Sequence, residues 1–344
     1  MKLNIKQLIN REICHFSDST SLITSKYNKI FIKKKDIQEF TVKLPADATW
    51  KRLFAHSRLA RRALRIDKCN VVPTEKGFIA IRQSRVFYYD EKNNQLKQVL
   101  TLKNCRNILH QSIAVNQNKE FFFGEYGNNG NRLEVPVYKS SDCGQTWETI
   151  FTFPAGKIKH IHGCFYDPFE EKIWTVTGDF KNECHILCSD FNFNHIEWIG
   201  DGQQMYRTCR LFFQEDTIHW IMDSPLQDSY HVVLNRKTRK AQKKQLFQGP
   251  VWYTKKLEDH FYLAATAQEI GPGVKDHLSH LMVSKDLEKW EDIYQFEHDG
   301  YPKRYFKFGV IGFADGSQDS KNFYMFAEAL KGFDGKIAVC EIVQ

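Results

Sequence analysis

The sequence lacks several features that mark common functional classes. No apolar run approaches the roughly 20 residues that a membrane-spanning helix needs. Residues 1–14 contain neither the apolar core nor the cleavage site of a secretory signal. A phosphate-binding loop, a dinucleotide fingerprint and a G-x-S-x-G nucleophile motif are all missing. Zinc-finger and RNA-binding-strand patterns are missing too, so we expect no nucleic-acid partner.

The nine cysteines contain no C-x-x-C pair, and their number is odd. Several lie in apolar, strand-like segments, as Cys340 does in residues 337–342. Reduced and mostly buried thiols are the simplest explanation, because disulfides persist mainly in oxidising compartments. The sequence therefore predicts a cytoplasmic protein.

The formal net charge of +8 is spread over local runs. Lysines occupy positions 33–35, arginines gather at positions 61–65, and a third run covers residues 236–244. Such runs are typical of a solvated surface on the turn side of strands. An anionic partner, such as an acidic glycan, is the alternative interpretation.

Helical periodicity is scarce, and residues 50–64 are the best candidate for a helical segment. Elsewhere, short apolar or alternating runs are separated by turn residues, which is typical of β-sandwiches, barrels and propellers. Aromatic residues make up 14% of the chain and favour strands. The sequence therefore predicts an all-β fold.

A weak repeat organises the predicted strands. Each unit contains a first strand, a polar turn, an aromatic-rich second strand and an outer pair, and units begin near residues 112, 163, 211, 251 and 309. Two more units fit residues 20–45 and 70–102. This spacing matches a propeller blade of about 40–50 residues. We predict a single β-propeller domain over residues 1–344, with seven four-stranded antiparallel blades, or six if the N-terminal strands complete the last blade.

The sharpest local motif occupies residues 140–147, with the sequence SSDCGQTW. It fits the pattern S-x-D-x-G-x-T-W, in which Asp caps turn amides, Gly takes a positive φ and Trp packs between blades. Two degraded copies lie at residues 189–198 and 284–290. The motif predicts a turn between the outer strands of a blade, with structural roles for Ser140, Asp142, Gly144, Thr146 and Trp147.

Through this motif, the sequence resembles the Asp-box (BNR-repeat), sialidase-like propeller family over about residues 70–300. The resemblance implies a fold shared with glycoside hydrolases, and it places the boxes away from the active site. Sialidases bind the substrate carboxylate with three arginines, for which Arg207 and Arg210 are candidates, with Arg65 or Arg304 as the third. The early F/Y-R-I-P motif of true sialidases is missing from this chain.

Polar residues recur at two positions of the predicted blades. The start of a first strand and the end of a second strand belong to an antiparallel pair, so they reach the same end of the blade. The residues at first-strand starts are His110, His160, His162, Arg207, Arg210, Trp252 and Lys307. Those at second-strand ends are Glu125, Asp179, Asp223, Glu269 and Glu328. Either each acid caps its own turn, or the set forms one mixed-charge pocket.

A pocket of this kind fits hydrolysis of a glycosidic bond in an acidic or polysaccharide-related sugar. Of Asp179 and Asp223, we expect one to act as the acid and the other, or Glu125, as base or nucleophile. His162 would position or protonate the substrate, and Arg207 would bind its anionic group. The remaining predicted substrate-binding residues are Arg210, His110, His160, Trp252, Glu269, Lys307 and Glu328.

Two alternatives stay open at this level. A propeller with a charged face also binds a glycan or a protein partner without catalysis. A metal-dependent or lyase-type carbohydrate enzyme is the other alternative, because His160 and His162 are alternate residues of a strand and would face one way. We assign no cofactor and no metal from the sequence, and whether the chain is an enzyme stays open.

Overall fold

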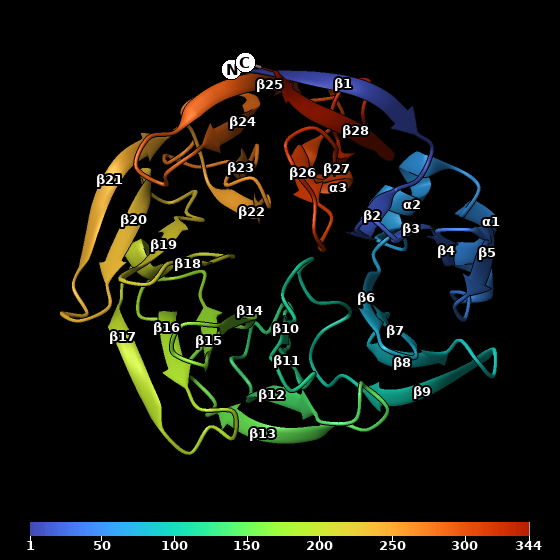
Figure 1. The fold of residues 1–344 in the computed structure, drawn as a ribbon, viewed down its shortest axis with the longest axis horizontal. Coiled ribbons are helices and arrows are strands. Elements are labelled where there is room, and N and C mark those ends of the chain that lie inside the picture. Colours follow the sequence, from blue (N-terminus) through green and yellow to red (C-terminus); the bar gives the residue numbers. More distant parts are fainter. Residues whose placement is uncertain (344) are drawn as a thin grey trace. The chain divides into compact units, whose positions relative to one another are not determined.

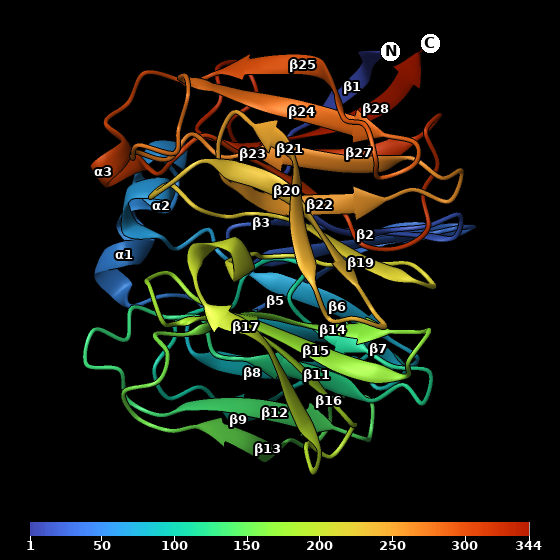
Figure 2. The same ribbon diagram turned by 90° about the vertical axis from the view of Figure 1, so that its left-hand side faces the viewer.

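The structure is a computed structural model that describes residues 1–343. It contains two compact units, which are residues 70–247 and residues 1–69 together with 248–344. Every sheet in either unit has four antiparallel strands. Figures 1 and 2 draw these strands as labelled arrows.

Residues 70–247 form four sheets, and the strands of each sheet are consecutive in the sequence. The first two sheets are β6 (Asn70–Thr74), β7 (Gly77–Arg82), β8 (Arg85–Asp90) and β9 (Gln95–Thr101), then β10 (Ala114–Val115), β11 (Phe121–Gly124), β12 (Val135–Ser140) and β13 (Glu148–Phe153). The next two are β14 (Ile161–Asp167), β15 (Lys172–Thr177), β16 (Cys184–Ser189) and β17 (Ile196–Gly202), then β18 (Phe212–Phe213), β19 (Thr217–Ile221), β20 (Ser229–Asn235) and β21 (Ala241–Phe247).

The other unit contains three sheets, and one of them joins both ends of the chain. Two sheets are β2 (Ile13–Ser17), β3 (Ser21–Lys26), β4 (Lys29–Lys34) and β5 (Ile37–Lys43), then β22 (Val251–Lys256), β23 (Tyr262–Thr266), β24 (Leu278–Ser284) and β25 (Glu291–Glu297). The third is β26 (Val310–Phe313), β27 (Phe323–Glu328) and β28 (Lys336–Val343), completed by β1 (Lys2–Ile9). Strand β1 pairs with β28 so that Lys2 lies opposite Val343.

The predicted fold class is confirmed: the chain is an all-β, seven-bladed β-propeller with four-stranded antiparallel blades. The N-terminal strand does complete the last sheet, but the number of blades is seven because residues 13–43 form a sheet of their own.

Burial differs systematically between the strands of a blade. The second strands are buried on both faces, as in β15 and β23, where nearly every residue is buried. The fourth strands, such as β9 and β25, are largely exposed. Neighbouring sheets pack through these apolar second strands: Trp174 of β15 and Trp220 of β19 are both fully buried in one cluster. The second strands thus contribute large buried side chains to the packing between neighbouring sheets.

The segment predicted to be helical consists of α1 (Thr49–Phe54) and α2 (Arg58–Leu64). The Ser57 hydroxyl caps α2 by accepting from the Ala60 amide at 3.3 Å, and Arg65 ends the helix with φ of 57°. The other short helices are the 3₁₀ turn η1 (Gln204–Tyr206) and α3 (Lys303–Phe306). Within residues 1–343, no helix has the length and apolarity to cross a membrane.

The motif at residues 140–147 forms the turn between β12 and β13. Asp142 Oδ1 accepts from the amides of Gln145 and Thr146 at 3.0 and 2.9 Å. Gly144 has a φ of +89°, and a Cβ there would lie 2.4 Å from Ile79, so two constraints favour glycine. The Trp147 ring packs edge-on against Phe123 at 4.9 Å.

The two degraded copies occupy equivalent positions, between β16 and β17 and between β24 and β25. Asp190 Oδ1 accepts from the amides of Asn192 and Asn194, and Asp286 Oδ1 accepts from those of Glu288 and Lys289. In three sheets, therefore, the turn between the two outer strands is capped by an aspartate side chain that accepts from backbone amides.

All nine cysteines are free thiols, and only Cys143 is partly exposed. Burial raises the pKa of the Cys164 thiol to about 12, so this side chain behaves as a small apolar residue. The cytoplasmic location stays a prediction.

Candidate active site

The strongest polar cluster lies in residues 70–247 and contains five of the predicted site residues. His160 and His162 lie at the start of β14, and Asp179 lies two residues beyond the end of β15. Arg207 follows η1, and Asp223 lies two residues beyond β19. Two neighbouring blades therefore supply these side chains from the same kind of strand end.

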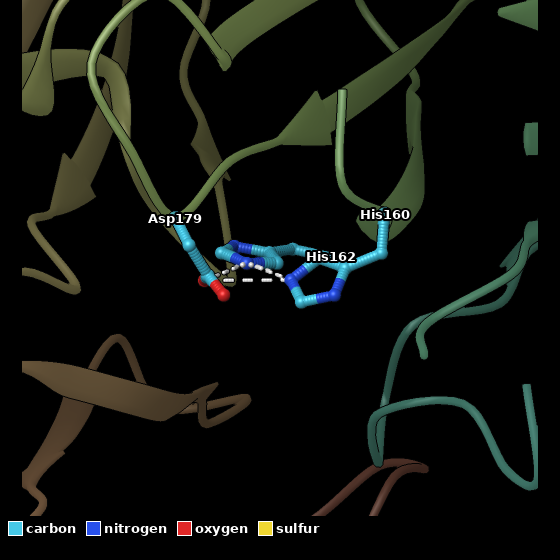
Figure 3. A group of neighbouring side chains, drawn as sticks. All are labelled: His160, His162 and Asp179. Carbon is cyan, nitrogen blue, oxygen red and sulfur yellow. Dashed lines mark hydrogen bonds and ion pairs between the residues drawn. The ribbon is translucent and has the colours of Figure 1, made fainter. Parts of the chain in front are cut away.

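A bulge at the start of β14 sets the direction of the two histidines. The pairing of β14 with β15 shifts register between Ile161 and Gly163, which leaves His162 as the extra residue. Such bulges redirect side chains. The Nε2 atoms of His160 and His162 lie 3.1 Å apart, and His162 Nε2 lies 3.3 Å from Asp179 Oδ1 (Figure 3).

Main-chain carbonyls fix both imidazole rings. His160 Nδ1 lies 2.8 Å from the carbonyl oxygen of Gly127, and His162 Nδ1 lies 2.9 Å from that of Thr208. A carbonyl only accepts, so both Nδ1 atoms carry the proton. In the neutral rings, the Nε2 atoms therefore present their lone pairs toward Asp179.

Asp179 is held ionised by its neighbours. Lys159 Nζ lies 2.6 Å from Oδ2, and Arg207 Nη2 lies 3.2 Å from Oδ1. Both ion pairs favour the carboxylate form of Asp179 over its protonated form. Burial lowers the pKa of His160, although Asp179 opposes this shift.

Asp223 lies on the other side of Arg207 and His162. Its Oδ2 is 3.3 Å from Arg207 Nε and 3.3 Å from the Cys209 sulfur. Its Oδ1 is buried and has no hydrogen-bond partner within residues 1–343, which is unusual for a native carboxylate. Burial and Asp223 raise the pKa of Cys209 well above its usual value, so this side chain is a thiol rather than a nucleophilic thiolate.

Glu125 does not share this arrangement. Its two carboxylate oxygens accept from the amides of Lys103 and Asn104 at 2.6 and 2.7 Å, and the Tyr138 hydroxyl donates to it at 2.8 Å. These bonds fix a loop, so the structure gives Glu125 the position of a turn-capping acid.

Arg210 and His110 lie in the same unit as the cluster. Arg210 donates to the carbonyl of Gln111, and its guanidinium lies over the Phe165 ring at 5.2 Å. His110 lies in the turn before β10. The Arg210 guanidinium is thus directed toward the loop before β10 and the Phe165 ring.

The other predicted residues lie in the unit of residues 1–69 and 248–344 and form two separate groups. Trp252 Nε1 donates to Glu269 at 2.6 Å. Lys307 lies 3.0 Å from Asp67 and 3.4 Å from Glu328. Lys68 contacts Glu328 at 3.0 Å. The buried charges of Lys307, Asp67 and Glu328 thus have partners of opposite charge.

Sequence reasoning missed Lys159, Cys209 and Asp67. Lys159 directly precedes His160, so its position beside a first-strand start was a usable signal. Asp67 gave no signal, because it follows a helix and meets Lys307 only through the fold.

Comparison with known proteins supports the fold. No family model matches the chain, and no curated protein matches it. The chain is similar to a solved structure of an oligogalacturonate lyase from Vibrio parahaemolyticus, with a TM-score of 0.63, 8% identity and coverage of 100% of this chain and 98% of that one.

Two other solved structures are similar to the chain. A chain of the mitotic checkpoint complex has a TM-score of 0.58 at 8% identity, with coverage of 99% of this chain and 95% of that one. The extracellular domain of a putative one-component system from B. thetaiotaomicron has a TM-score of 0.56 at 11% identity, with coverage of 98% and 40%. At these identities the likeness concerns the propeller fold.

Proposed function

We propose that the chain is a carbohydrate-active enzyme that acts on an acidic sugar at the cluster of His160, His162, Asp179, Arg207 and Asp223. The observation that carries the proposal is the convergence of two imidazoles and one guanidinium on Asp179, with a second carboxylate, that of Asp223, on the same guanidinium. Perturbed titratable groups gathered in this way are typical of active sites. The likeness to an oligogalacturonate lyase adds support for a carbohydrate substrate.

The geometry favours elimination over hydrolysis. A glycosidase of the paired-carboxylate kind keeps one carboxyl protonated. Asp179 instead forms ion pairs with Lys159 and Arg207, which favour its ionised form. Glu125 is occupied by two amides and a tyrosine. The lyase alternative therefore fits these residues better than the paired carboxylates that we predicted from the sequence.

In elimination from a uronic acid sugar, the C5 proton is removed, the C4–O bond breaks and a C4–C5 double bond forms. The leaving sugar takes up a proton at the released oxygen. Positive charge near the carboxylate stabilises the anion that forms next to it. Lys159 and Arg207 supply that charge, and the cluster also contains electron-rich imidazole nitrogens.

The test is to incubate the purified chain with oligomers of hexuronic acids and, as a control, with neutral oligosaccharides. Elimination produces both new reducing ends and the ultraviolet absorbance of the unsaturated product, whereas hydrolysis produces reducing ends alone. We expect both signals in the wild type, and their loss in Arg207→Gln and Asp179→Asn.

Arg132→Gln is the matched control, because Arg132 pairs with Glu183 at 2.7 Å and donates to the carbonyls of Asn129 and Gly130 rather than to the cluster. Its activity should equal that of the wild type. Reducing ends without absorbance would restore the hydrolase prediction. Ligand-induced thermal stabilisation without any product would instead support a non-catalytic glycan-binding propeller.

A further inference from the structure

Three electron-rich atoms converge on one point of the cluster. The distance between His160 Nε2 and His162 Nε2 is 3.1 Å. Asp179 Oδ1 lies 3.3 Å from His162 Nε2 and 3.4 Å from His160 Nε2. Figure 3 shows the two rings and the carboxylate facing one another.

This arrangement needs an electron-poor occupant. Both Nδ1 atoms donate to backbone carbonyls, so each neutral ring directs an Nε2 lone pair at the others. Two lone pairs and a carboxylate oxygen at these separations repel one another. A cation between them removes the repulsion.

The size of the triangle fits a metal ion. A metal bound at about 2.0–2.1 Å from each ligand atom separates its ligands by about 3.0 Å at right angles and about 3.4 Å at tetrahedral angles. The three observed edges fall in this range. We propose that His160 Nε2, His162 Nε2 and Asp179 Oδ1 bind a divalent transition-metal ion. Two imidazoles and one carboxylate are ligands that suit such ions and leave further coordination positions open.

The surrounding contacts are those of supported metal ligands. Each Nδ1–H is fixed by a carbonyl, and the second oxygen of Asp179 is held by Lys159 at 2.6 Å. Asp179 is also the most exposed of the three ligands: its side chain is 15% exposed, against 4% for His160 and 1% for His162. An open coordination position would therefore face the side of Asp179.

A second group of potential ligands fits less well. His162, Cys209 and Asp223 also lie close together. This group needs Nδ1 of His162, which already donates to the Thr208 carbonyl at 2.9 Å. The Cys209 thiol, whose pKa is raised, would also have to lose its proton. We therefore assign the cation to the His160–His162–Asp179 triad.

The metal site itself does not depend on the proposed function, whereas the role of the ion in catalysis does. If the cluster acts on an acidic sugar, the bound ion adds its charge to that of Lys159 and Arg207 and meets the sugar's carboxylate directly. Proton transfer then falls to groups outside the triad. Binding of the ion itself needs no substrate.

The experiment uses the full chain after EDTA treatment and desalting, titrated with Zn²⁺, Mn²⁺ and Mg²⁺ by calorimetry. We expect one site for Zn²⁺ or Mn²⁺ and none for Mg²⁺, which prefers oxygen ligands. His160→Gln and His162→Gln should weaken binding by more than the about 10–100-fold that loss of a supporting group costs.

Two variants are matched controls. His219 and His231 form another buried pair at 3.1 Å, but within residues 1–343 they belong to no group of three potential metal ligands, so His219→Gln should bind the ion like the wild type. Cys209→Ser should also keep the affinity. Loss of binding in Cys209→Ser alone, or wild-type affinity in His162→Gln, would overturn the assignment.

A second measurement does not depend on variant folding. Wild-type chain labelled with ¹⁵N-histidine should show two Nε2 resonances that shift with Zn²⁺ while their Nδ1 atoms stay protonated. No histidine shift, or a shift at Nδ1, would refute the site. Elimination that is equal with and without EDTA would refute the ion's role but keep the proposed function. Metal binding without any turnover would keep the metal site but refute the proposed function.

Discussion

Arg207 and Asp179 contact each other twice. Nη2 of Arg207 lies 3.2 Å from Asp179 Oδ1, and Nη1 donates to the Asp179 backbone carbonyl at 2.9 Å. Because its Nε also contacts Asp223 at 3.3 Å, one guanidinium holds the carboxylates of two consecutive blades in place. A planar fork is suited to this task, and an ammonium group is not.

The first prediction concerns this bridge. Arg207→Gln leaves buried carboxylates without their partner, so we expect a loss of about 3 kcal/mol in the free energy of unfolding. Arg207→Lys should recover only part of it. Urea denaturation measures both. The partly exposed pair of Arg132 and Glu183 is the comparison, and Arg132→Gln should cost about 1 kcal/mol or less. Equal losses in Arg207→Gln and Arg132→Gln would contradict the importance of the bridge.

A second prediction concerns Asp167, which is buried in β14. Its carboxylate receives two hydrogen bonds from Arg236, at 2.5 and 3.0 Å, and one from Trp174 at 3.2 Å. Asp167→Asn leaves Arg236 with only the partly exposed Glu170, at 3.2 Å, as a charged partner, and should cost about 3 kcal/mol of stability. Glu297→Gln, which breaks an exposed pair with Lys331, should leave the urea midpoint unchanged. A small effect at Asp167 would mean that Arg236 finds another partner.

The third prediction concerns pH. Burial lowers the pKa of His219 to about 4, and burial together with His219 lowers that of His231 to about 3. Both values lie below the ordinary value of 6.5, so the unfolded chain binds more protons than the folded one below that pH. Stability should therefore be unaffected above about pH 6.5 and should fall between about pH 6.5 and 4, by on the order of 3 kcal/mol per histidine.

Urea denaturation of wild type and of the double variant His219→Gln, His231→Gln at several pH values isolates this effect. The difference in free energy between the two proteins should shrink as the pH falls. His195→Gln is the control, because the His195 side chain is 89% exposed. A difference that does not vary with pH would show that the buried pair keeps its ordinary pKa.

The fourth prediction concerns the turn at residues 140–147. Asp142→Ala removes the acceptor of two amides and of the Thr146 hydroxyl, so the free energy of unfolding should fall by about 1–2 kcal/mol. Asp190→Ala, in the equivalent turn of the next sheet, should have a similar effect. Turnover per folded molecule should be unchanged in both. Lost activity at full stability would place this turn at the functional site.

Much of the fold could be predicted because its signals are local. Aromatic strands, turn residues and the aspartate turns repeat along the chain, and each needs only a few neighbouring residues to form. The number of blades was less certain from sequence, because the pairing of β1 with β28 joins residues more than 300 positions apart. Such pairings leave no periodic pattern.

The candidate site was predictable only in part. The alternation of strand ends correctly indicated that His160, His162 and Asp179 lie together. The same rule also selected Glu125, whose partners are two amides of a distant loop. It selected Lys307 as well, whose charge is met by Asp67 beside α2. The rule identifies which residues reach one end of a blade, but their partners depend on loops between blades.

The pairing of β1 with β28 also bears on how the chain is made. Strand β1 has its partner more than 300 residues later in the sequence, so it stays unpaired while the residues between them are synthesised. Until β28 is in place, β1 and β27 both expose strand edges that are able to pair with other chains. Closing so long a loop slows folding more than it reduces final stability. Conversely, because Lys2 and Val343 lie opposite each other, a short linker between them would permit new termini to be opened at any exposed turn between blades.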